Sequence, residues 1–256
     1  MSQDTPQKPL FDLHAVFEVD DYLYFYGDSL TDERSDAEVA SLVTLLELDS
    51  PMKILDLACG FGRHANRLAA LGHSVTGVDL MAGFLEIARH HAAEQGVQVD
   101  YRQGDMRQIN FTEEFDRVVL LFTSFGYFAD DENVQVMENI ARALKPGGLL
   151  GFDIPNRDVM VKNLPTSDVV EKDGDLMINR LSFDMLTGRF HNRRIVIREG
   201  VRKDKPFSVR LYNITEIRDL LNQVGLEVYK LTGYDGQPLS ADSRGMVVVA
   251  KKPLPA

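Results

Sequence analysis

Short apolar runs alternate with segments of helical spacing between residues 53 and 155, and this alternation constrains the fold more than any other feature. Strands are expected at 53–58, 74–80, 97–105, 116–122 and 149–155, and helices at 63–72, 83–96 and 132–144. The run at 116–122, DRVVLLF, is almost wholly apolar, as a strand covered on both faces must be. The alternation predicts an α/β fold with a doubly wound, mostly parallel sheet, whose ligands bind at the carboxyl ends of its strands.

The pattern changes after residue 155. Residues 157–212 contain alternating segments separated by turn signals, which predicts an inserted antiparallel β cap. A helix at 215–225, opened by Thr215, and two strands at 226–234 and 245–252 follow. The link between these two strands is short, so we expect a hairpin in which the last strand runs antiparallel.

Length, charge and cysteine content narrow the class of protein. The 256 residues fit a single domain, 1–256, that carries an elaboration. A formal net charge of −11 gives no general attraction to nucleic acid or to an anionic membrane, so neither partner is expected. Cys59 is the only cysteine, which excludes a cysteine-based zinc cluster, and no metal site is predicted. No apolar run approaches the ~20 residues that span a bilayer, and no signal peptide is recognised, so a cytoplasmic location is expected.

A Gly-x-Gly turn lies between the first strand and the first helix, in ILDLACGFGRHANRLAALG at 54–72. Two classes of cofactor fit such a turn. GFGRHA at 60–65 satisfies the dinucleotide pattern G-x-G-x-x-G/A, and Asp79 stands 19 positions after Gly60, where a ribose-binding acid is expected. Glycines at a tight strand-to-helix turn are also needed in proteins that bind no ligand there.

Asp56, four positions before the first glycine, distinguishes the two cofactors. A dinucleotide brings a pyrophosphate to this turn, and a carboxylate beside it would repel the phosphate charges. S-adenosylmethionine carries an ammonium and a sulfonium and has no phosphate, so a carboxylate would attract it. The charge pattern therefore favours S-adenosylmethionine over a nicotinamide dinucleotide.

Four motifs resemble those of the class I S-adenosylmethionine-dependent methyltransferases, across residues 50–252. LDLACGFG is similar to their first motif, with Ala58 in place of the first glycine, and VTGVDL is similar to the second. QGDMRQI at 103–109 is similar to the third, and LKPGGLLGFDIPN at 144–156 to the turn and fifth strand. The resemblance implies a Rossmann-like, seven-stranded sheet with an antiparallel last strand. It also points to a bacterial small-molecule subgroup with a β insertion after the fifth strand.

The resemblance implies a role for each motif in holding the cofactor. Asp79 would accept both ribose hydroxyls, Asp105 would lie near the adenine amino group, and Met106 would lie against the ring. The N-terminal segment, residues 1–48, would form a lid, with Arg34 pairing with the methionine carboxylate and Tyr22 or Tyr26 nearby. These aromatics could instead anchor the first helix on the core. The predicted cofactor-binding set is Asp56, Ala58, Gly60, Gly62, Asp79, Leu80, Gly104, Asp105, Met106, Leu121, Tyr22, Tyr26 and Arg34.

FTSFGYF at 122–128 follows the fourth strand, where the family places groups beside the transferring methyl. The Asn/Asp-Pro-Pro-aromatic motif of enzymes that methylate exocyclic amino groups of bases is absent here, which argues against that substrate class. His191 and Tyr127 are the predicted catalytic residues, as bases for a hydroxyl or amine acceptor. The predicted substrate pocket comprises Ser124, Phe125, Tyr127, Arg210 and Tyr212.

The sequence thus predicts an S-adenosylmethionine-dependent methyltransferase. It would move a methyl group to an O, N or C atom of a small-molecule acceptor by in-line displacement, with S-adenosylhomocysteine as the second product. The alternatives are a nicotinamide-dependent oxidoreductase and a cofactor-binding protein without turnover, while the acidic balance disfavours RNA or protein methylation. The sequence leaves open whether the β cap covers its own site or that of a neighbour in a homodimer.

Overall fold

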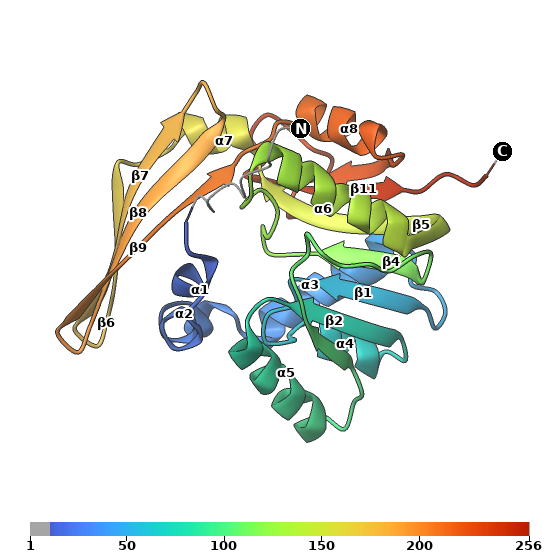
Figure 1. The fold of residues 1–256 in the computed structure, drawn as a ribbon, viewed down its shortest axis with the longest axis horizontal. Helices are drawn as coiled ribbons and strands as arrows, with labels where there is room; N and C mark the ends of the chain where they lie inside the picture. Colours follow the sequence, from blue (N-terminus) through green and yellow to red (C-terminus); the bar gives the residue numbers. More distant parts are fainter. Residues whose placement is uncertain (1–10, 256) are drawn as a thin grey trace, which may run out of the picture.

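Two β-sheets organise residues 11–255, the part of the chain that the computed structural model describes (Figure 1). The larger sheet has seven strands in the order β10-β11-β5-β4-β1-β2-β3, and the smaller has four in the order β6-β7-β8-β9. In Figure 1 the small sheet, in yellow and orange, stands beside the large one, with α1 and α2 between them. The predicted α/β fold with an antiparallel β insertion is confirmed.

The seven-stranded sheet is parallel except for one strand. Its strands are β1 (Lys53–Leu57), β2 (Ser74–Asp79), β3 (Asp100–Gln103), β4 (Phe115–Leu120), β5 (Leu144–Pro155), β10 (Glu227–Thr232) and β11 (Gly245–Lys251). β1 pairs in parallel with β2 and β4, whereas β11 pairs antiparallel with both β5 and β10. The expected antiparallel last strand is therefore confirmed.

Helices cover both faces of this sheet. Leu55 and Val118 belong to one core cluster, with residues of α6 (Asp130–Ala143) and α8 (Ile214–Gln223). Ile54 and Val119, their neighbours along the strands, belong to the other cluster, with residues of α3 (Asp32–Leu45), α4 (Ala65–Ala70) and α5 (Ala82–Glu94). Successive side chains of a strand point to opposite faces of the sheet. Because helices cover both faces, these strands are apolar at successive positions.

The β insertion begins later than its predicted start at residue 157. Residues at that point form a short helix, α7 (Arg157–Lys162), because the Asn156 side chain accepts a hydrogen bond from the Asp158 amide at 3.2 Å. The helix expected to open at Thr215 instead has Asn213 as its cap. Asn213 Oδ1 accepts from the Glu216 amide at 2.8 Å, and the Glu216 carboxylate accepts from the Asn213 amide at 2.9 Å.

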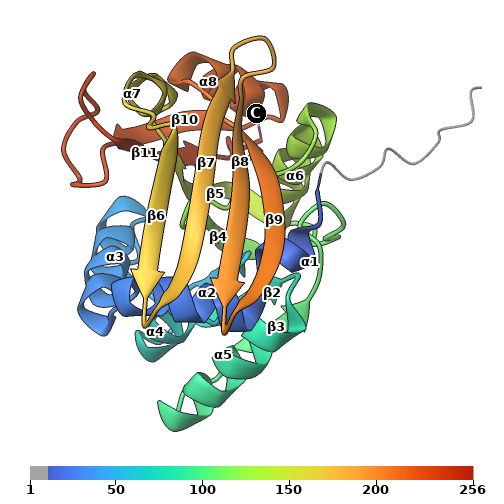
Figure 2. The same cartoon turned by 90° about the vertical axis from the view of Figure 1, so that its left-hand side faces the viewer.

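The small sheet is a meander of neighbouring antiparallel strands. It comprises β6 (Ser167–Lys172), β7 (Asp175–Asp184), β8 (Arg189–Arg198) and β9 (Val201–Arg210). Figure 2 shows the four strands side by side, with α2 running across their lower ends. Among the described residues, no helix is long and apolar enough to cross a bilayer.

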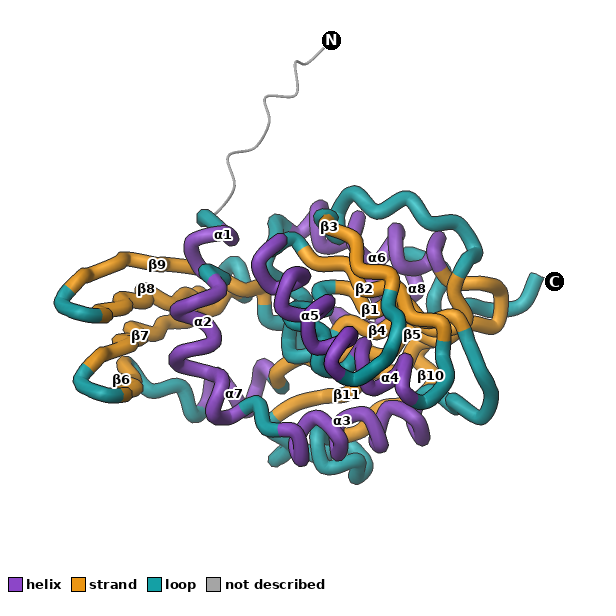
Figure 3. Tube along the Cα trace, turned by 90° about the horizontal axis from the view of Figure 1, so that it is seen from below, coloured by secondary structure: helices purple, strands orange, loops and turns teal. Residues whose placement is uncertain are grey.

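The first two helices, α1 (Leu13–Val16) and α2 (Val19–Tyr26), lie between the two sheets, and the 3₁₀ turn η1 (Gly27–Ser29) leads from them to α3 on the large sheet. Phe25 of α2 packs against Met177 and Val196 of the small sheet. Tyr22 of α2 packs on Phe84 of α5, with ring centroids 5.2 Å apart. Figure 3 shows α2 in this position from below.

A buried ionic cluster fastens α2 to the small sheet. The Asp21 carboxylate accepts from Lys205 Nζ at 2.5 Å and from Arg198 Nη1 at 2.9 Å, and Lys203 Nζ lies 2.7 Å from Glu18. The Asp21 and Lys205 side chains are 5% and 4% exposed. Burial alone would raise the pKa of Asp21, but the hydrogen bonds from Lys205, Arg198 and Lys203 outweigh it and lower the pKa below its usual value. The stabilisation is therefore present at neutral pH and is lost as the pH falls below 3.8.

We predict that Asp21→Asn lowers the free energy of unfolding at pH 7 by about 3 kcal/mol, because it leaves the buried Lys205 ammonium short of a counter-charge. Urea-induced unfolding would measure the change. Asp20→Asn is the matched control, since Asp20 is exposed on the same helix and should change stability by less than about 0.5 kcal/mol. Equal losses in the two variants would show that the cluster does not stabilise the fold.

Candidate functional site

A cavity of about 320 Å³ lies at the carboxyl ends of β1 to β4. Its lining includes the residues that follow these strands: Ala58 to Phe61, Leu80 and Met81, Gly104 to Met106, and Leu121 to Ser124. The chain proceeds from β1 to β2 and β3 on one side and then returns to β4 on the other. Loops diverge at such a switch point and leave room for a ligand, and this volume is typical of a small-molecule site.

Asp56, near the end of β1, is fully buried at this cavity. Its Oδ2 atom has no hydrogen-bond partner among the described residues. Burial raises the pKa of Asp56 to about 7, against the opposing effect of Arg63, and Asp79 raises it further. A buried oxygen without a partner is costly, so a cationic group of a ligand would stabilise it.

Asp79, the last residue of β2, connects two loops of the cavity. Its Oδ2 accepts from the Gly60 amide at 2.8 Å and its Oδ1 from the Met81 amide at 2.8 Å. Its backbone carbonyl accepts from the Gly104 amide at 2.9 Å, which adds the loop after β3. Each carboxylate oxygen can accept a second hydrogen bond, so the group could also receive ligand hydroxyls.

The glycine turn divides into residues that face the cavity and one that does not. Ala58 and Gly60 line it, both with a φ of 56°. Ala58 thus adopts the left-handed region that favours glycine, and it stands where the family's first motif has its first glycine. Gly62 does not line the cavity. Packing and backbone both require glycine there, because a Cβ would lie 2.1 Å from the Tyr101 hydroxyl and the φ of 78° is in the left-handed region.

Asp105 and Met106 line the cavity, as predicted for the third motif. The Asp105 carboxylate already accepts from Arg107 Nη2 at 2.6 Å and from the Arg107 amide at 2.9 Å. Although burial opposes the change, these hydrogen bonds lower the pKa of Asp105. The carboxylate is therefore ionised and fixed in place at neutral pH.

Arg34 does not lie where the sequence predicted it. It is exposed on α3, where its Nε lies 2.9 Å from Glu38 Oε1 and its Nη1 donates to the Ser29 carbonyl at 3.1 Å. Arg34 is not among the residues that line the cavity. Its guanidinium lies 5.2 Å from the centroid of the ring of Phe122, a residue that does line it.

Arg63 lines the cavity in its stead and was missed by sequence reasoning. Its side chain is 8% exposed, pairs with Glu38 and donates to Ser35 Oγ at 3.3 Å. Its Nη2 is buried without a partner among the described residues. The available signal was its position directly after Gly62, where the chain passes from the glycine turn into α4.

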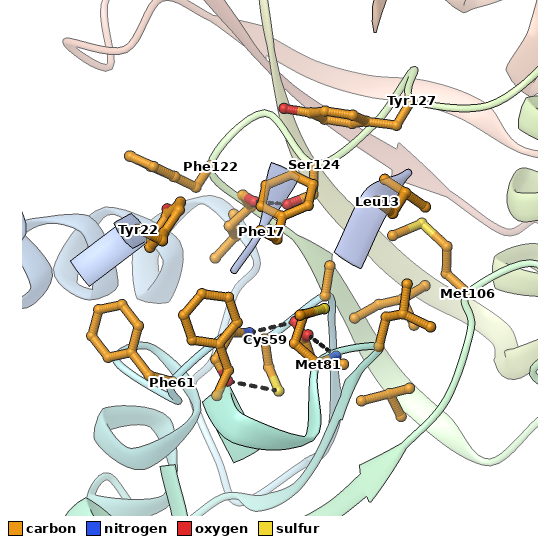
Figure 4. A pocket seen from close by; sticks show the side chains of 18 of the residues that line it. Leu13, Phe17, Tyr22, Cys59, Phe61, Met81, Met106, Phe122, Ser124 and Tyr127 are labelled. Atoms are coloured by element: carbon orange, nitrogen blue, oxygen red, sulfur yellow. Dashed lines mark hydrogen bonds between the residues drawn. The ribbon is translucent and has the colours of Figure 1, made fainter. Parts of the chain in front are cut away.

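Tyr22 and Tyr26 of α2 line the cavity, with ring centroids 5.0 Å apart, and Leu80 and Leu121 also line it. The first helices thus contribute to the wall and anchor on the core at once. Figure 4 shows Tyr22, Phe61 and Phe122 on one side, with Leu13 and Met106 on the other. In that view Tyr127 lies at one end and Cys59 at the opposite end.

Only part of the predicted substrate pocket reaches the cavity. Ser124 and Tyr127 line it. Phe125 is 2% exposed in the core, where it stacks on Tyr212 with centroids 5.3 Å apart, so neither ring faces a ligand. Arg210 pairs with Glu216 at 2.6 Å and does not line the cavity either.

His191 lies away from the cavity. Along β8, Asn192 and Arg194 share one face of the strand, and His191 has the opposite parity. Arg194 lines the cavity, whereas His191 does not. The structure therefore does not bring His191 to the predicted acceptor pocket. The residue of β8 that faces the cavity is Arg194.

The loop after β4 has a strained backbone. Phe122 and Thr123 have φ values of 60° and 56°, which is rare for residues with side chains and especially for a β-branched one. The Thr123 amide donates to Asp153 Oδ2 at 3.1 Å. Burial raises the pKa of Asp153 to about 6, although this hydrogen bond opposes the change. Such strain persists where the surroundings hold it, and it is common at functional sites.

Comparison with known proteins agrees with this geometry. Residues 54–148 match the family model of a methyltransferase domain. YqeM of Bacillus subtilis, whose name assigns it to the methyltransferases, is 30% identical over 210 residues, which are 78% of this chain and 84% of YqeM. The dTDP-4-amino-2,3,4,6-tetradeoxy-D-glucose N,N-dimethyltransferase of Saccharopolyspora spinosa is 30% identical over 193 residues, 73% of each chain.

The fold has solved counterparts. The crystal structure of an S-adenosylmethionine-dependent methyltransferase from Clostridium acetobutylicum superposes with a TM-score of 0.77 over 92% of this chain and 98% of that one, at 18% identity. The seven-stranded sheet, the glycine turn and these matches lead to one assignment. The chain belongs to the S-adenosylmethionine-dependent methyltransferase family.

Proposed function

We propose that this protein transfers the methyl group of S-adenosylmethionine to a small-molecule acceptor bound in the same cavity. One observation carries the proposal: a single cavity joins the unpartnered Asp56 carboxylate and the loops of β1 to β3 to the side chains of Ser124 and Tyr127. The name of the S. spinosa relative specifies an amino sugar linked to a nucleotide, which is a small molecule. The acceptor atom here would be an oxygen, nitrogen or carbon.

The residues around the glycine turn suit the two charged groups at the amino-acid end of the cofactor, its ammonium and its carboxylate. The unpartnered Asp56 oxygen would accept from the ammonium, and the free Nη2 of Arg63 would donate to the carboxylate. Asp79 would receive the ribose hydroxyls, and Met106 would pack against the adenine. A pyrophosphate would instead meet the Asp56 carboxylate, so the dinucleotide alternative does not suit these charges.

When bound, the cofactor supplies a methyl group on a positively charged sulfur, which a nucleophile displaces in line. The chain's own residues then have to orient the acceptor and exclude water, and good orientation can contribute roughly 7–11 kcal/mol. The Tyr22 and Tyr26 rings would cover the site from α2. No covalent intermediate on the protein is needed, in keeping with a buried Cys59 whose pKa is raised well above its usual value by burial.

Tyr127 would position the acceptor through its hydroxyl. Burial raises the pKa of Tyr127 to about 12, so the phenol stays protonated at neutral pH. A protonated phenol can donate or accept a hydrogen bond but is a poor base. We therefore assign Tyr127 an orienting role, and His191 no longer has a role in the proposed reaction.

Calorimetric titration with S-adenosylhomocysteine and with NADH tests the cofactor, and we expect binding of the first alone. Incubation with methyl-labelled S-adenosylmethionine and separate small-molecule, RNA and protein fractions of a bacterial extract then tests the acceptor. Label should enter the small-molecule fraction. Label in RNA or protein alone, or S-adenosylhomocysteine binding without any transfer, would contradict the proposal.

We predict that Arg63→Gln weakens S-adenosylhomocysteine binding by about tenfold or more, because it removes a charged hydrogen bond to the carboxylate. Arg34→Gln is the matched control and should change the Kd by less than about twofold, since Arg34 lies on the surface. 5′-Methylthioadenosine has no amino-acid end, so Arg63→Gln should leave its affinity nearly unchanged. A larger loss of affinity in Arg34→Gln than in Arg63→Gln would indicate that Arg34, the residue predicted from the sequence, binds the carboxylate of the cofactor.

The affinity for S-adenosylhomocysteine should rise with pH. The pKa of Asp56 is about 7, so at a lower pH its carboxyl is protonated in the free protein. Binding of the ammonium must then displace that proton. We therefore expect the Kd to fall by about fivefold between pH 6 and 7, by about tenfold between pH 6 and 8, and to level off above pH 8. Asp56→Asn should bind weakly with a flat profile, and 5′-methylthioadenosine should bind the unaltered protein independently of pH. A flat profile for the unaltered protein would separate Asp56 from the ammonium.

A further inference from the structure

We propose that the methyl acceptor is a small molecule with a carboxylate, and that Arg194 binds this carboxylate. The inference rests on the proposed function and assigns the substrate class of the same cavity. It starts from the Arg194 guanidinium on the small sheet. Among the described residues no acidic side chain neutralises its charge, and the proposed contacts of the cofactor do not involve it.

Arg194 is held rigidly at the cavity wall. Its Nε donates to Asn179 Oδ1 at 2.9 Å and its Nη2 to the Tyr26 hydroxyl at 2.8 Å. The guanidinium lies 4.8 Å from the centroid of the Phe207 ring. Asn179 is itself fixed, because its Oδ1 also accepts from the buried Asn192 Nδ2 at 2.9 Å. A planar cation held in this way is preorganised for a flat anion.

The charge of Arg194 has no counter-charge nearby. The other cations that this face of the small sheet presents to α2, namely Lys203, Lys205 and Arg198, all pair with Glu18 or Asp21. Within residues 11–255 no carboxylate lies within 4.0 Å of the Arg194 guanidinium, and its Nη1 makes no hydrogen bond. A partly buried cation without a counter-charge is unfavourable even where neutral groups accept its hydrogen bonds, and an anionic ligand would relieve that cost.

The position of Arg194 separates its anion from the carboxylate of the cofactor. Arg63 follows the glycine turn directly, and its guanidinium lies 5.0 Å from the centroid of the Phe122 ring. Arg194 lies instead over Phe207, whose ring stacks on Tyr127 with centroids 6.2 Å apart. In Figure 4 Tyr127 lies at the top of the cavity, whereas Phe122 lies at its left, near Tyr22. The two cations therefore lie over different rings of the cavity wall, Arg63 over Phe122 and Arg194 over Phe207.

The surroundings of Arg194 indicate the rest of the acceptor. Leu13, Phe17, Phe128, Tyr127 and Phe207 line the cavity with apolar surface, which suits a hydrophobic or aromatic body. One guanidinium supplies a single positive charge, and its free N–H groups suffice for the two oxygens of one carboxylate. A phosphate dianion would keep an excess negative charge in this apolar end. The geometry thus points to an apolar carboxylic acid.

Calorimetry on the S-adenosylhomocysteine complex tests this with 4-hydroxyphenylacetate and its neutral amide, 4-hydroxyphenylacetamide. We expect the acid to bind at least about tenfold more tightly than the amide. Arg194→Gln should abolish that preference and Arg194→Lys should restore part of it. Arg193→Gln is the matched control, because Arg193 is exposed on the opposite face of β8, and it should keep the preference.

Several results would overturn the inference. These are equal affinity for acid and amide, no binding of either probe, an unchanged preference in Arg194→Gln, or tighter binding of 4-hydroxyphenylphosphonate than of the acid. A loss of S-adenosylhomocysteine affinity in Arg194→Gln as large as in Arg63→Gln would reassign Arg194 to the cofactor. Failure of the unaltered protein to bind S-adenosylhomocysteine would instead contradict the proposed function, so the two failures are distinguishable.

Discussion

The ion pair between Asp21 and Lys205 is the constraint on which the shape of the cavity depends. It joins residues 184 positions apart and holds α2 against the small sheet. With one face of α2 fixed there, the adjacent face presents Tyr22 to Phe84 of α5. The large sheet supplies the floor of the cavity, and this single helix, held by charges on β9, supplies much of the wall. From this helix Tyr22 and Tyr26 line the cavity.

The part of the site that the sequence predicts correctly is local in character. Asp56 is the penultimate residue of β1 and Asp79 the last of β2, and the two strands pair in parallel, so their carboxyl ends meet at one edge of the sheet. Parallel pairing follows from the strand–helix–strand order alone. No knowledge of distant contacts is needed to place these two acids together, and the loops with Gly60 and Gly104 follow for the same reason.

The residues that sequence reasoning misplaced differ in the direction in which their side chains point, which only the tertiary structure decides. His191 and Arg194 occupy one strand, and only the register of β8 against its neighbours decides which of them meets the cavity. Arg34 and Arg63 likewise both pair with Glu38, but one side chain lies on the surface and the other is buried. Phe125 has the composition of a pocket residue, yet tertiary packing turns it into the core. Residue type and spacing cannot distinguish such cases.

Of the residues described, the small sheet reaches the cavity through Arg194 and Phe207 alone. The loops that follow β1, β2 and β3 belong entirely to the other sheet. These two positions lie outside the loops that would hold the methyl donor, and the contact of Arg194 with the Tyr26 hydroxyl is their link to the wall that α2 supplies. A scaffold divided in this way lends itself to gene duplication and divergence, since a copy could acquire a new acceptor through a pair of replacements and keep its donor chemistry intact.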